Sequence, residues 1–142
     1  MDIAFYHVTR GPVEAVLPRL LERAFASGLR VALRVPDPAR RAALDQHLWT
    51  YDALSFLPHA AEPCESAADQ PILLTATHTA ANDAQMLVAL EPPLPRDGFA
   101  RAALIFADAD AVPARAEWKA LKADGIAATY WKQTASGWEK AG

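Results

Sequence analysis

A basic and aromatic stripe in the last quarter of the sequence is the arrangement of residues best suited to binding chemistry. The stripe consists of Arg115, Trp118, Lys119 and Lys122, within the segment ARAEWKALKADG. Their spacing of i, i+3, i+4 and i+7 places all of them on one face of an α-helix. Cations around an indole ring favour a ligand that is acidic and partly apolar. The alternative is a solvated basic face with Trp118 turned toward the core, because Ala114 and Leu121 share that side.

A second candidate site is the aromatic segment LDQHLWTYDALSFLPHA, at 44–60, which includes the end of a predicted helix. Its candidate interface residues are Trp49, Tyr51, Phe56, Leu57 and Pro58. Crowded aromatic residues in a loop are typical of surfaces that bind another protein. The alternative is that these side chains close one end of the hydrophobic core.

The sequence patterns that indicate catalysis are missing. The first predicted strand-to-helix loop, TRGPVEAV, has one glycine followed by proline, so it matches neither G-x-G-x-x-G nor the P-loop. The four histidines lack the H-x-x-x-H spacing typical of a zinc site, and the single Cys64 lies in a polar segment. No G-x-S-x-G nucleophile motif is present. We therefore expect no catalytic residues, no metal and no cofactor.

The composition is that of one globular domain. The chain has 142 residues, of which 52% are hydrophobic and 22% are charged, so residues 1–142 are expected to form a single domain. The net charge of −3 argues against a positive field that would capture nucleic acid directly. Any single-stranded DNA should therefore be reached only indirectly, through a protein partner.

The sequence also predicts the cellular compartment. The start, MDIAFYHVTRGP, is unlike a secretory signal, and no segment reaches the roughly 18 apolar residues that a membrane span needs. One cysteine excludes an intramolecular disulfide and fits a reducing environment. We expect a cytoplasmic protein without a membrane partner.

Alternating strand and helix patterns predict an α/β fold. Strand patterns occur at 3–8, 30–35, 71–75, 86–90, 102–107 and 126–138. Helices are predicted from 13 to about 27, from 38 to 48 and over the basic stripe. Pro18 should kink the first helix or move its start to a later residue. The pattern predicts a single-domain, Rossmann-like, three-layer fold with a mostly parallel sheet of five or six strands and no phosphate-binding loop.

At these motifs the chain resembles the chi subunit of the bacterial DNA polymerase III holoenzyme. The resemblance runs nearly end to end, and its most specific part is the aromatic segment. It is carried further by FYHV at 5–8, RVALRV at 30–35, PILLT at 71–75 and RAEWKALKADG at 115–125. It implies a Rossmann-type domain without catalytic activity that bridges two partners. One is the psi subunit of the clamp loader, and the other is the acidic, phenylalanine-terminated C-terminal tail of single-stranded DNA-binding protein.

The resemblance also implies which residues bind the tail. Arg115, Trp118 and Lys119 match the family's arginine, aromatic residue and lysine, and Lys122 matches a further basic position. The sequence departs from the family pattern at Ala111, where a lysine is expected, and at Trp118, where tyrosine is usual. The first departure implies a weaker or re-centred electrostatic contact, and the second keeps the packing role of the ring.

Two placements stay open at the level of sequence. Leu104 and Phe106, at the end of a predicted strand, are candidates for lining the pocket that receives the phenylalanine ring of the tail. We assign the psi contact to the aromatic segment, because a stable subunit interface needs an apolar centre. The alternative is that Trp49 and Phe56 pack internally beside the tail pocket.

Three functions compete at this stage. The first is a non-catalytic adaptor of the replication machinery, which the resemblance favours. The second is a nucleotide- or phosphate-dependent α/β enzyme whose site lacks a familiar motif. The third is direct binding of single-stranded DNA by the basic stripe, although three cations make a small site for that purpose.

Overall fold

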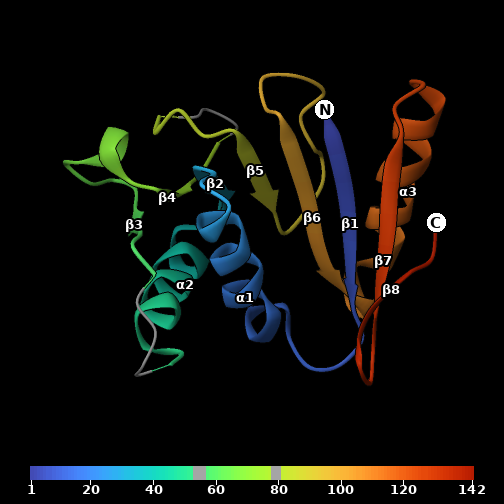
Figure 1. The fold of residues 1–142 in the computed structure, drawn as a ribbon, viewed down its shortest axis with the longest axis horizontal. Coiled ribbons are helices and arrows are strands. Elements are labelled where there is room, and N and C mark those ends of the chain that lie inside the picture. The colour runs from blue at the N-terminus through green and yellow to red at the C-terminus, as the bar shows by residue number, and fades with distance from the viewer. Residues whose placement is uncertain (53–56, 78–80) are drawn as a thin grey trace.

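The computed structural model describes residues 1–52, 57–77 and 81–142, which form alternating strands and helices (Figure 1). The strands are β1 (Asp2–Val8), β2 (Val31–Arg34), β3 (Ala60–Ala61), β4 (Ile72–Thr75), β5 (Met86–Ala89), β6 (Arg101–Ala107), β7 (Ala128–Thr134) and β8 (Gly137–Lys140). The helices are α1 (Val13–Ala26), α2 (Pro38–Thr50) and α3 (Ala111–Ala123), with the short 3-10 turns η1 (Ala67–Asp69) and η2 (Asp108–Asp110). In this part of the chain no helix is both long and apolar enough to cross a membrane.

One sheet contains these eight strands, in the order β3-β4-β2-β5-β6-β1-β7-β8. Every neighbouring pair is parallel except β7 and β8, which form an antiparallel hairpin. This confirms the prediction of an α/β fold with a mostly parallel sheet. The prediction of five or six strands was too low. It missed β3, which has only two residues, and it treated β7 and β8 as one strand, although the chain folds back between Thr134 and Gly137 to form a hairpin.

The helices cover both faces of the sheet, which makes three layers (Figure 1). Helices α1 and α2 pack on one face, against side chains such as Leu33 and Ile105. Helix α3 packs on the other face, against side chains such as Phe5 and Leu104. Successive side chains of a strand point to opposite faces, so the neighbours Leu104 and Ile105 belong to different clusters. This arrangement is compatible with the Rossmann-like prediction.

Pro18 lies inside α1, which nevertheless begins at Val13 and ends at Ala26. A proline has no N–H to donate to the carbonyl group four residues earlier. That carbonyl belongs to Glu14, and it forms a 2.8 Å hydrogen bond with Nε2 of His47 on α2. The neighbouring helix thus supplies the donor that the proline lacks, and the later start that Pro18 suggested is wrong.

Candidate partner-binding site

The basic stripe lies on α3, above an aromatic cluster that joins this helix to the sheet. Trp118 is half-buried. Its ring makes edge contacts with Phe5 of β1 and Tyr130 of β7, at centroid distances of 5.3 and 5.6 Å. Ala114 and Leu121 of the same helix are fully buried. Trp118 therefore lies at the boundary between the core and the exposed face of an amphipathic helix.

The three cations of the stripe are exposed. Nζ of Lys122 lies 4.6 Å from the centre of the Trp118 ring, within the range of a cation–π interaction. In the described part of the chain, none of Arg115, Lys119 and Lys122 forms an ion pair with a carboxylate. The structure thus brings the four predicted residues together and leaves their positive charges open to an acidic ligand. The cations are solvated and Trp118 contacts the core, as the alternative of a solvated basic face predicts, while binding of an acidic ligand stays a prediction.

Three residues that the sequence analysis linked to the stripe are buried. Leu104 and Phe106 have exposed fractions of 0% and 1%, so the expectation that they line an open pocket is wrong. They form the floor beneath the aromatic cluster, because strand alternation points both toward α3. Ala111 is also buried in this cluster, so the position at which the family pattern has a lysine faces the sheet here.

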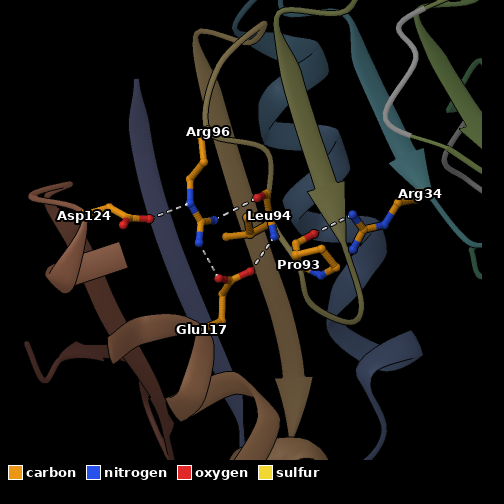
Figure 2. A network of polar contacts seen from close by, with 6 residues as sticks. All are labelled: Arg34, Pro93, Leu94, Arg96, Glu117 and Asp124. Carbon is orange, nitrogen blue, oxygen red and sulfur yellow. Dashed lines mark hydrogen bonds and ion pairs between the residues drawn. The ribbon is translucent and has the colours of Figure 1, made fainter. Parts of the chain in front are cut away.

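A buried carboxylate that the sequence analysis missed fixes the other side of α3 (Figure 2). Glu117 is 6% exposed. Its Oε2 accepts a hydrogen bond from the backbone N–H of Leu94 at 2.6 Å, and its Oε1 accepts one from the guanidinium of Arg96 at 2.8 Å. The bond from Arg96 to Glu117 raises the pKa of that guanidinium. Helical spacing is the sequence signal that could have identified Glu117 as buried, because it lies between two apolar positions of the buried helix face.

Arg34 binds the segment between β5 and β6, the segment that also contains Leu94 and Arg96 (Figure 2). This residue of β2 is 4% exposed, and burial lowers the pKa of its guanidinium. It donates hydrogen bonds to the backbone carbonyls of Pro93, at 2.5 Å, and of Glu91. The segment between β5 and β6 is therefore tied to both β2 and α3, and it supports the helix that carries the basic stripe.

A second polar network surrounds the buried His7 and joins the carboxyl ends of β1 and β6 to β7. His7 is 5% exposed, and its ring stacks on that of Phe106 at a centroid distance of 4.8 Å. Nε2 of His7 lies 2.5 Å from Oδ1 of Asp108, and Nδ1 lies 2.9 Å from the hydroxyl oxygen of Tyr130. No local sequence pattern predicts this connection, because its members are 101 and 123 residues apart along the chain.

The loop between β1 and α1 offers no open backbone cradle for a phosphate. The amides of Thr9 and Arg10 both donate to Oε1 of Gln133, at 3.1 and 2.9 Å. In a phosphate-binding loop such amides face the ligand. Within residues 1–52, 57–77 and 81–142, no group of three or more His, Cys, Asp or Glu is placed to hold a metal ion. These residues add no support for the nucleotide-dependent enzyme.

The aromatic segment presents part of its predicted interface to solvent. Trp49, near the end of α2, is 45% exposed, and its ring lies 4.2 Å from that of His59 between centroids. Tyr51 is half-buried and donates a hydrogen bond to the carboxylate of Glu22 on α1. Pro58 is half-buried as well. Trp49, Tyr51 and Pro58 are therefore the predicted interface residues that keep contact with solvent near the end of α2.

Leu57 differs from these three residues. It is 1% exposed and packs in the core cluster beneath α1 and α2, so its assignment to an interface is wrong. The physical reason is that an apolar side chain next to Pro58 can turn inward to fill the core. Phe56 lies outside the described residues.

The geometry defines a class of protein: a mostly parallel α/β domain with exposed cations beside an aromatic cluster. The chain belongs to the DNA polymerase III chi subunit (HolC) family, whose model matches residues 1–129, so the predicted family is confirmed. Over 96 residues it is 31% identical to the DNA polymerase III subunit chi of Pseudomonas aeruginosa, covering 66% of each chain. Over 91 residues it is 28% identical to the probable DNA polymerase III subunit chi of Rickettsia prowazekii, covering 64% of this chain and 55% of the relative. The chain thus spans between about half and two thirds of the length of these relatives.

Proposed function

We propose that this protein is a non-catalytic accessory subunit of the DNA polymerase III holoenzyme, an adaptor during DNA replication. The basic stripe binds the acidic C-terminal tail of single-stranded DNA-binding protein, and a separate surface binds the psi subunit. The adaptor thereby links the clamp loader to protein-coated single-stranded DNA. The observation that carries the proposal is the group of exposed cations around the half-buried ring of Trp118.

The stripe matches the chemistry of such a tail. Arg115 and Lys119 suit the aspartates and the terminal carboxylate, because hydrogen bonds between charged groups are the strongest. The exposed part of the Trp118 ring suits the terminal phenylalanine. Each charged hydrogen bond contributes roughly 1.5–3 kcal/mol, and burial of the phenylalanine contributes a similar amount. After the cost of ordering a disordered tail, we expect a dissociation constant on the order of micromolar.

Replacement of one cation tests this site. We expect Arg115→Ala to weaken binding of a labelled peptide ending in Asp-Phe-Pro-Phe by about tenfold or more, since it removes a bidentate donor. Fluorescence anisotropy measures the affinity. Arg19→Ala is the matched control, because Arg19 is an exposed arginine on α1, on the opposite face of the sheet. Its affinity should stay within about twofold of the wild type.

Two results would contradict the proposed tail site. Equal affinities of the wild type and the Arg115→Ala variant would place the tail elsewhere on the protein. Equal affinities for the full peptide and for one that lacks the last phenylalanine would show that charge alone drives the contact. No binding by the wild type at ~50 μM would overturn the tail-binding function itself.

We place the psi contact at Trp49 and include Tyr51 and Pro58 as further members. Tryptophan is enriched among residues that dominate the energy of protein interfaces. We therefore expect Trp49→Ala to weaken psi binding by about tenfold or more, measured by isothermal titration calorimetry. Phe25→Ala is the matched control, because Phe25 on α1 is similarly exposed, at 40%. Unchanged psi affinity in the Trp49 variant would move this contact to another surface.

A further inference from the structure

We infer that His7 and Asp108 position Tyr130 as a further residue of the tail-binding site. The inference rests on the function proposed above. Tyr130 is not part of the stripe, but its ring lies 5.6 Å from that of Trp118. Burial raises the pKa of the Tyr130 hydroxyl, and the positive charge of Arg115 opposes this increase. Tyr130 therefore lies beside the aromatic ring of the stripe, and Nζ of Lys122 lies 4.6 Å from the centre of that ring.

The hydrogen bonds around His7 decide how the Tyr130 hydroxyl is oriented. The carboxylate of Asp108 only accepts, so Nε2 of His7 carries the proton that it donates across 2.5 Å. In the neutral imidazole Nδ1 is then an acceptor, and the Tyr130 O–H donates to it across 2.9 Å. The Tyr130 O–H is consequently turned toward His7, and only the lone pairs of its oxygen remain for other donors.

The neighbours of His7 hold this imidazole in place. On one side its ring stacks on Phe106 of β6, and the register of β7 places Lys132 beside it on the other. The His7 side chain is 7% exposed, so the ring has little room to turn. Asp108 begins η2, directly before α3. The chain of hydrogen bonds therefore connects the start of α3 to the ring that flanks Trp118.

A fixed Tyr130 affects binding through its neighbour in the stripe. The fixed phenol ring restricts the adjacent ring of Trp118, whose centroid lies 5.6 Å away. Groups that are already oriented lose less conformational entropy when a ligand binds, which raises affinity without a new contact. His7 and Asp108 are thus positioning residues that act through Tyr130.

A double-mutant cycle on His7 and Tyr130 tests this inference, read as affinity for the same labelled tail peptide. His7→Phe keeps a ring that can stack on Phe106, while Tyr130→Phe removes only the hydroxyl. We expect each single variant to weaken binding by about three- to tenfold, and the double variant to be no weaker than either. Asp108→Asn retains an acceptor oxygen and should bind within about twofold of the wild type, whereas Asp108→Ala should resemble His7→Phe.

The outcomes separate this inference from the proposed function. Unchanged affinity of Tyr130→Phe, or additive losses in the double variant, would overturn the inference alone. Tyr130→Phe gives that test even if circular dichroism shows that His7→Phe does not fold. A wild-type protein that does not bind the peptide would overturn the proposed tail binding and this inference together.

Discussion

Among single residues, the buried charge of Glu117 decides how firmly α3 is held. Glu117→Gln keeps the shape of the side chain but replaces one acceptor oxygen with a donor. That donor must face either the N–H of Leu94 or the guanidinium of Arg96, both of which also donate. We expect the free energy of unfolding to fall by about 1–3 kcal/mol. Urea denaturation measures this change.

The control for Glu117 is a carboxylate that binds the same guanidinium at the surface. The side chain of Asp124 is 57% exposed, and its Oδ2 lies 3.4 Å from Nε of Arg96. Exposed ion pairs contribute roughly 0–1 kcal/mol, so Asp124→Asn should change the free energy of unfolding very little. If Asp124→Asn lowered the free energy of unfolding more than Glu117→Gln, burial would not be what makes the Glu117 carboxylate the more stabilising of the two.

The candidate site was predictable from sequence where local spacing defines it. Helical periodicity found the basic stripe, because neighbours on a helix face are only three or four residues apart. Leu57 was misassigned because composition does not say which residue of an irregular apolar segment turns inward. The contact of His7 with Tyr130 depends on the parallel pairing of β1 with β7, which no local pattern encodes. Long-range pairing therefore limits what the sequence reveals about the support of the stripe.

For the secondary-structure elements, periodicity predicted most of the fold and failed where tertiary contacts define the structure. Interior strands such as β2 and β4 were found because their short, mainly apolar runs are buried on both faces. Strand β3 was missed because two residues carry no periodicity, and only pairing with β4 makes them a strand. Helix α1 begins earlier than Pro18 suggested because His47, from α2, bonds to the carbonyl of Glu14.

That contact between helices leads to a prediction about α1. His47→Ala removes the partner of the Glu14 carbonyl, so we expect the free energy of unfolding to fall by about 0.5–1.5 kcal/mol in urea denaturation. The loss should be smaller when Pro18→Ala is also present, because an alanine at 18 restores the N–H that bonds to this carbonyl within the helix. Equal losses in both backgrounds would show that His47 contributes through packing alone.

For the whole molecule, the position of the two candidate contacts determines whether it can act as a bridge. Trp49 lies on α2 and the basic stripe lies on α3, and these helices cover opposite faces of the sheet (Figure 1). A rigid sheet between two surfaces keeps one ligand from blocking the other. We therefore expect the labelled tail peptide to bind with the same affinity, within about twofold, whether or not psi is saturating.

Salt should separate the two contacts in the same anisotropy and calorimetry experiments. The tail contact that we propose would rest on exposed cations, so its affinity should fall steeply as ionic strength rises and the Debye length shrinks from about 10 Å at 0.1 M. The psi contact that we propose would rest on apolar burial and should change little, because the hydrophobic effect does not depend on charge. Displacement of the peptide by psi would instead mean that both ligands share one face, and the protein could then exchange the two partners but not connect them.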